Sequence, residues 1–160
     1  MHKQNLKVLP YLKIIGAVIA ILYVVNCIRT PDEFHFLGGV NLIIHEAGHF
    51  VFMFFGQFIH VLGGSLLQVM MPICFAVYFY LRKDMYSGSI ILLWLGQSIT
   101  DVARYLSDAA VMQLPLLGGD SVIHDWNFLL TAVGLLNYTS IIGSVLNALG
   151  ILVVLSLIHI

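Results

Sequence analysis

Five stretches of predominantly apolar residues alternate with short polar connections along the chain. The five stretches cover approximately residues 14–28, 40–59, 66–81, 87–106 and 141–158. A helix needs about 20 mostly apolar residues to cross the hydrocarbon core of a bilayer. The pattern therefore predicts an all-α polytopic membrane protein with about five transmembrane helices, folded as a single integral membrane domain over residues 1–160.

The composition agrees with this fold class and narrows the partners. Of the 160 residues, 60% are hydrophobic and only 9% are charged, far from the average of soluble domains. With a net charge of −1 and no basic run, the chain lacks the electrostatic footprint of a nucleic-acid-binding protein. Cys27 and Cys74 lie far apart inside apolar stretches, where each is expected to pack as a small hydrophobic side chain.

Basic residues near the apolar stretches bear on orientation. Three lysines (Lys3, Lys7 and Lys13) precede the first stretch, which lacks a small-residue cleavage pattern after it. We therefore expect a retained first span with a cytoplasmic N-terminus, by the positive-inside rule. If every stretch crossed fully, the Arg82-Lys83 pair would fall on the opposite side, so either the rule is overruled or one segment does not cross.

Glycines interrupt the chain after the second apolar stretch. Gly56, Gly63 and Gly64 bracket β-forming residues in "GQFIHVLGGSLLQ". Such glycines mark helix ends and turns, and non-helical backbone at membrane depth must be buried in protein or line a cavity. The pattern predicts a short re-entrant or sheet-like element directly after the helix of about residues 40–59.

That same helix carries the motif H-E-x-x-H, as His45, Glu46 and His49. Positions i and i+4 share a helix face, so the two imidazoles can bind one zinc ion while the glutamate points toward a water activated by the metal. The alternative is a set of packed polar residues that bond neighbouring helices. A single Asp, Lys or Arg in a span costs about 2.5–3.5 kcal/mol on insertion scales, so three ionisable residues together favour a shared purpose.

The stretch "HEAGHFVFMFFGQFIHVLGGSLLQ" resembles the start of the site-2-protease family of intramembrane zinc metalloproteases. The resemblance covers about 25 of the 160 residues. It implies that His45 and His49 bind zinc, that Glu46 is the general base, and that an aspartate on a later span is the third ligand. The family's later motif, an Asn-Pro pair or a Leu-Asp-Gly, is absent, and "LPLLGGDS" has related letters in a different order.

The third ligand must therefore be sought among candidates by their chemistry. A loop or helix start at about residues 120–128 contains "HDW", in which His124 and Asp125 both offer zinc-binding atoms. The alternative there is a helix-capping aspartate with a surface histidine. Asp101 is the rival candidate, although Arg104 lies at i+3 from it and at i−4 from Asp108, a spacing that favours an intrahelical ion-pair ladder.

Two further polar residues are expected to serve the structure. His60 could face a cavity near the sheet-like element, but a satisfied polar contact is the preferred interpretation. Gln97, in the middle of an apolar stretch, would be unpaired in lipid and is predicted to face the protein interior.

These features predict an intramembrane zinc metalloprotease with one Zn²⁺ per chain. Glu46 would act as general base in the hydrolysis of a membrane-embedded or membrane-proximal peptide substrate. One alternative keeps the zinc but assigns hydrolysis of a lipid or small molecule, or a non-catalytic metal-binding role. Another is a non-enzymatic helical scaffold or transporter fragment.

Overall fold

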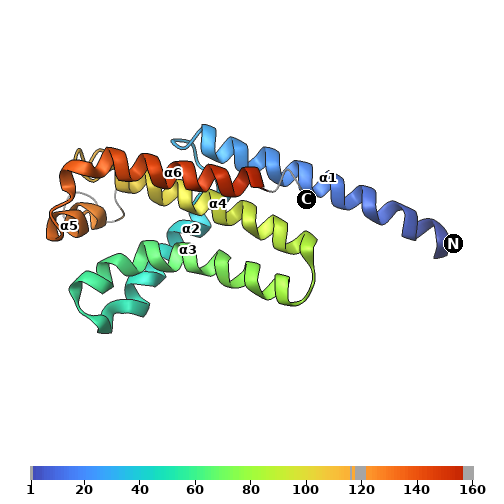
Figure 1. The fold of residues 1–160 in the computed structure, drawn as a ribbon, viewed down its shortest axis with the longest axis horizontal. Helices are drawn as coiled ribbons and strands as arrows, with labels where there is room; N and C mark the ends of the chain where they lie inside the picture. The colour runs from blue at the N-terminus through green and yellow to red at the C-terminus, as the bar shows by residue number, and fades with distance from the viewer. Residues whose placement is uncertain (1, 116, 118–121, 157–160) are drawn as a thin grey trace.

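The computed structural model describes residues 2–115, 117 and 122–156, and all regular structure within these ranges is helical (Figure 1). The elements in chain order are α1 (His2–Arg29), α2 (Phe36–Phe52), η1 (Met53–Phe55), α3 (Gln57–Leu81), α4 (Met85–Asp108), α5 (Asp125–Ala132), η3 (Leu136–Tyr138) and α6 (Thr139–Ser156). The predicted all-α class is confirmed for this part of the chain.

Four segments of the described chain are long and apolar enough to cross a membrane. They are Pro10–Arg29, Phe36–Phe55, Gln57–Leu81 and Leu136–Ser156. Large apolar side chains such as Ile19 and Phe54 lie exposed on these helices, as expected where lipid is the solvent. These features indicate a membrane protein. A fifth span is not confirmed, because α4, which covers the predicted stretch of residues 87–106, is not among these segments.

The more polar helix α4 packs against α1, α2, α3 and α6. Its polar residues Gln97 and Ser98 are buried among these neighbours. Asp108 is buried at the C-terminal end of α4, where it accepts hydrogen bonds from the backbone N–H groups of Gln113 and Leu114. Glycines bring α4 and α6 close together: a Cβ at Gly96 would lie 2.9 Å from the carbonyl oxygen of Gly150. Small residues at helix contacts allow such a close approach of backbones in membrane proteins. The polarity of α4 is thus used for contacts inside the helix bundle.

The predicted re-entrant or sheet-like element after the motif helix is not confirmed, and its sheet-like form is absent from this described segment, because α3 is helical from Gln57 onward. The chain instead turns at Gly56, whose positive φ of 84° suits a residue without a side chain. Gly63 and Gly64 lie buried inside α3, and a Cβ at Gly63 would lie 2.8 Å from the carbonyl oxygen of Gly48 on α2. These glycines let α2 and α3 pack closely. Their spacing in the sequence is the same whether they serve helix packing or mark a turn, so the sequence did not distinguish the two roles.

The start of α1 and the turn between α3 and α4 lie at the same end of the molecule (Figure 1). Lys13 Nζ lies 5.3 Å from the ring centroid of Tyr86, in the first turn of α4. The Arg82-Lys83 pair occupies the turn just before α4. Helices α1, α2 and α3 therefore cannot all be full, alternating crossings. The N-terminal lysines and the Arg82-Lys83 pair can lie on the same side of the membrane, in agreement with the positive-inside rule.

Candidate metal centre

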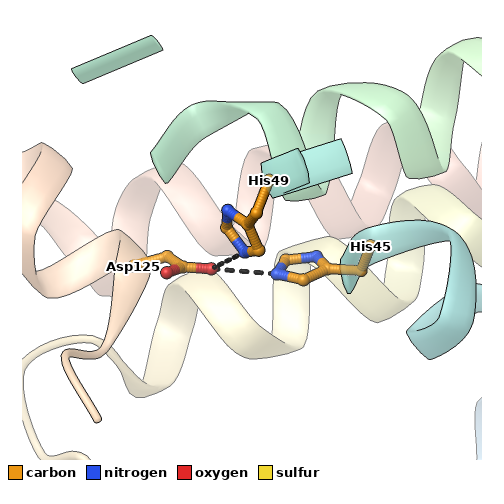
Figure 2. A group of neighbouring side chains, drawn as sticks. All are labelled: His45, His49 and Asp125. Carbon is orange, nitrogen blue, oxygen red and sulfur yellow. Dashed lines mark hydrogen bonds and ion pairs between the residues drawn. The ribbon is translucent and has the colours of Figure 1, made fainter. Parts of the chain in front are cut away.

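Three side chains from two distant parts of the sequence converge beside α3 (Figure 2). His45 and His49 come from α2, and Asp125 is the first residue of α5. Asp125 Oδ2 lies 2.9 Å from His45 Nε2 and 3.2 Å from His49 Nε2. One ligand atom from each residue lies within 4.8 Å of the other two. This group could hold a metal ion.

The helical spacing of α2 explains how the two histidine rings come together. Residues four apart lie on one face of a helix, and the His45 and His49 rings accordingly meet edge to face with centroids 4.8 Å apart. Gly64 of α3 lies directly beneath them, where a Cβ would come within 2.5 Å of His45 Nε2 and 2.7 Å of His49 Nε2. Only a glycine at this position leaves the space in front of both nitrogens open.

Contacts from α3 and α4 place the start of α5 and hence Asp125. The Asp125 backbone N–H donates to the Tyr105 hydroxyl at 3.1 Å. The neighbouring Trp126 indole N–H donates to Ser65 Oγ at 3.1 Å. Because Tyr105 lies on α4 and Ser65 lies next to Gly64 on α3, these bonds aim the carboxylate at the two histidines.

Each histidine has a second partner that leaves Nε2 free to bind metal. His49 Nδ1 donates to the backbone carbonyl of His60 at 3.0 Å. His45 Nδ1 lies 3.2 Å from Gln68 Oε1 and donates to it. Metal-binding histidines almost always donate their other ring N–H in this way, which fixes the ring and the tautomer.

The residues fit zinc in kind and in spacing. Two imidazole nitrogens and one carboxylate oxygen form a donor set of the kind found in catalytic zinc sites, where the fourth position stays open. With ligand distances near 2.0–2.1 Å, neighbouring ligand atoms of a tetrahedral site lie about 3.3 Å apart. The Asp125 contacts of 2.9 Å and 3.2 Å are close to that spacing, so a small outward movement would admit the ion.

The charge state of Asp125 suits a metal ligand. Burial raises the pKa of this carboxyl, but its polar contacts with the His45 and His49 rings lower it by more, so the pKa lies below its ordinary value. The carboxylate is therefore ionised at neutral pH, which is the form that binds a cation.

Glu46 lies next to this group without joining it. Its side chain is exposed and lines the same cleft, of about 1100 Å³, as the three converging residues. The cleft also carries apolar residues, among them Leu42 and Val61. Glu46 and the three converging residues therefore open onto the same cleft, whose walls are partly apolar.

The structure places Asp125, and not its neighbour His124, beside the motif histidines. His124 is the N-cap of α5: its Nδ1 accepts a hydrogen bond from the Asn127 backbone N–H at 3.3 Å. Its buried Nε2 lies 3.4 Å from Asp108 Oδ2 without hydrogen-bond geometry. Burial lowers the pKa of His124, although the Asp108 carboxylate opposes this shift. Of the two ligand candidates predicted from the sequence, Asp125 therefore belongs to the converging group and His124 caps α5.

Asp101 is not part of the converging group. Its Oδ2 instead accepts hydrogen bonds from Gln68 Nε2 at 2.8 Å and from Asn41 Nδ2 at 3.4 Å. The ion-pair ladder predicted for α4 is wrong, because Arg104 reaches across to the linker before α2. There it pairs with Asp32 and donates to the Pro31 carbonyl at 2.6 Å. Tertiary partners thus replaced the intrahelical pairs that the spacing favoured.

Two other expectations have opposite outcomes. Gln97 faces the interior as predicted: it is 5% exposed and accepts from Asn41 Nδ2 at 2.7 Å. His60 does line the cleft, but the satisfied side-chain contact predicted for it is wrong at Nδ1, which is buried and has no hydrogen-bond partner among the described residues.

Three contributors to the centre were not connected with it from the sequence, namely Gln68, Tyr105 and Gly64. Gln68 had a detectable signal, because an amide within the apolar run of α3 must find a partner in the protein. Tyr105 and Gly64 had none, because tyrosines and glycines are common throughout the sequence and only the packing of α3 and α4 makes these two important.

Comparisons of the chain with protein-family models, curated proteins and solved structures find no match.

Proposed function

We propose that this protein is an intramembrane zinc metalloprotease. The observation that carries the proposal is the convergence of His45, His49 and Asp125 within 4.8 Å, in the cleft that also contains Glu46. The histidines and the glutamate form H-E-x-x-H, a motif with a specific role in zinc-dependent hydrolysis. One zinc ion per chain is expected.

The division of labour follows from the chemistry of each residue. His45, His49 and Asp125 would hold zinc, which supplies a Lewis acid that lowers the pKa of a water molecule toward about 7. Glu46 would accept a proton from the attacking water and pass it to the leaving nitrogen of the peptide. Its exposed position in the cleft leaves it free to exchange that proton between the two.

The surroundings of the cleft favour a substrate within or close to the membrane. The motif helix α2 and its neighbour α3 are both apolar enough to lie in the bilayer. The walls of the cleft combine apolar side chains, such as Leu42, with polar groups near the metal position. An apolar peptide segment could therefore occupy the cleft with its backbone near Glu46.

The proposed orientation places the N-terminus in the cytoplasm. Lys13 lies beside Tyr86, so the basic N-terminal segment and the Arg82-Lys83 turn lie at one end of the molecule. Positive charges concentrated at one end favour that end as the cytoplasmic one.

The function can be tested with two variants that share the same chemical change. Glu46→Gln removes the base. Glu33→Gln is the matched control, since Glu33 is the other glutamate of the chain and lines the same cleft from the exposed linker before α2, outside the H-E-x-x-H motif. The proteins would be purified in detergent, their zinc content measured by mass spectrometry, and their activity followed with quenched fluorescent peptides that contain one apolar helix. A fluorogenic fatty-acid ester would be assayed in parallel.

We expect the wild type and Glu33→Gln to contain about one zinc per chain and to cleave peptides. Glu46→Gln should keep the zinc and lose cleavage by at least about 100-fold, the lower part of the range for general base catalysis. Hydrolysis of the ester alone would favour the lipid hydrolase instead. Zinc binding without turnover of either probe would indicate a non-catalytic metal protein, and a wild type that binds no zinc would overturn the proposal.

A further inference from the structure

A buried polar network lies behind His45, on the side away from Asp125. Asn41 is 0% exposed and Gln68 is 3% exposed, and both bond to Asp101 of α4. We propose that Asp101, acting through Gln68, is a positioning residue that fixes the ring orientation and the tautomer of His45. This inference rests on the proposed metal site and adds two residues to it.

The connection is a continuous chain of hydrogen bonds. Gln68 Nε2 donates to Asp101 Oδ2 at 2.8 Å. Gln68 Oε1 faces His45 Nδ1 at 3.2 Å. On the other side of the same imidazole ring, His45 Nε2 lies 2.9 Å from Asp125 Oδ2. A carboxylate on α4 is thereby linked, through one amide and one ring, to the position of the metal.

The direction of these bonds is determined by what each group can do. An ionised Asp101 carboxylate can only accept, as its Oδ2 does from Asn41 and Gln68, so the NH₂ of Gln68 must face it. The carbonyl oxygen of Gln68 is then left for His45, whose Nδ1 must carry the proton in order to donate. A neutral imidazole protonated at Nδ1 has its lone pair at Nε2, and Nε2 is the atom directed at the metal position.

The far end of the network has a fixed direction as well. The indole N–H of Trp94 can only donate, and it donates to Asn41 Oδ1 at 2.8 Å. Ser98 Oγ donates to the same oxygen at 3.1 Å. The NH₂ of Asn41 must therefore face Gln97 Oε1, at 2.7 Å, and the Asp101 carboxylate. With the Asp101 carboxyl ionised, neither amide can be reversed without placing two donors or two acceptors opposite each other.

Joining the helices alone would not require this arrangement. The bonds of Asn41 to Trp94, Ser98 and Gln97 already connect α2 to α4 without any metal ligand. The branch through Gln68 instead ends on His45 Nδ1. Residues that orient a metal-binding histidine typically contribute 10–100-fold to metal affinity, which gives the inference a measurable consequence.

The test compares two carboxylates of α4. Asp101→Asn removes the charge at the end of the hydrogen-bond chain that leads through Gln68 to His45. Asp108→Asn is the matched control, because Asp108 lies beside His124 instead. Gln68→Met replaces the linking amide by a side chain of similar length that cannot form these hydrogen bonds. This variant tests the proposal if Asp101→Asn does not fold. The full-length detergent-purified proteins would be titrated with Zn²⁺ against a chelator, and the visible spectrum of bound Co²⁺ would report ligand geometry.

We expect zinc affinity to fall about 10-fold in Asp101→Asn and by up to about 100-fold in Gln68→Met, each with an altered Co²⁺ spectrum. Asp108→Asn should keep the wild-type affinity and spectrum. Wild-type affinity and spectrum in both Asp101→Asn and Gln68→Met would overturn this inference and leave the proposed function standing. A wild type that binds neither metal would overturn both.

Discussion

Gly64 and His45 are in a contact that excludes any side chain at position 64. A Cβ on Gly64 would lie 2.5 Å from His45 Nε2, the atom that also faces Asp125 at 2.9 Å. The metal position is therefore bounded on one side by the bare backbone of α3. The relationship explains why a glycine lies inside a membrane helix, where it otherwise has no conformational requirement.

The first prediction concerns Gly64→Ala. The new methyl group should push both imidazole rings away from Asp125 and reduce bound zinc to less than about a tenth of the wild-type content, since a zinc site needs its three ligands within about 0.2 Å of their distances. Zinc content by mass spectrometry measures this loss. The control is Gly88→Ala on α4, where a Cβ would meet Phe79 at an ordinary 3.8 Å; equal zinc in both variants would contradict the prediction.

The second prediction separates the neighbours His124 and Asp125. Asp125→Ala should abolish zinc binding, because it removes the only non-histidine ligand of the group. His124→Ala should keep the zinc and lower the free energy of unfolding by about 1 kcal/mol, the usual cost of losing an N-cap. Zinc content and unfolding by denaturant in detergent distinguish the two. Loss of zinc in His124→Ala, with its helix content intact, would contradict the assignment.

The third prediction concerns topology. In a background with Cys27 and Cys74 replaced by alanine, single cysteines at Tyr11 and Lys83 should be labelled by an impermeant maleimide from the same side of the membrane. A cysteine at Val111, past the C-terminal end of α4, should be labelled from the opposite side. The reason is that the 24 residues of α4 extend about 36 Å, more than the hydrocarbon core. Labelling of positions 11 and 83 from opposite sides would contradict the arrangement.

The fourth prediction concerns the stability contributed by Asn41. Asn41→Ala should lower the free energy of unfolding by about 2 kcal/mol, because it leaves the partly buried donor of Trp94 and the buried donor of Ser98 without their acceptor. The measurement is the unfolding midpoint in detergent. Asn147→Ala on α6 is the control, since Asn147 is exposed, and it should change stability by less than about 0.5 kcal/mol. Equal effects of the two substitutions would rule out a special role for Asn41.

The sequence alone determined the elements whose signals are local. Long apolar runs must be satisfied within their own helices in lipid, so the helical membrane class could be read directly from the pattern. The i, i+4 spacing likewise put His45 and His49 on one face before any fold was known. Gln97 could be assigned to the interior because an unpaired amide in lipid is costly.

Only the tertiary structure decided which side chains meet across helices. His124 and Asp125 are adjacent and chemically similar as ligands, and the choice between them depends on how Tyr105 and Ser65 hold the start of α5. Gly64 could equally have marked a turn, and its role follows from the closeness of α2. Such contacts join residues up to 80 positions apart, so they depend on the packing of whole helices and have no counterpart in local spacing.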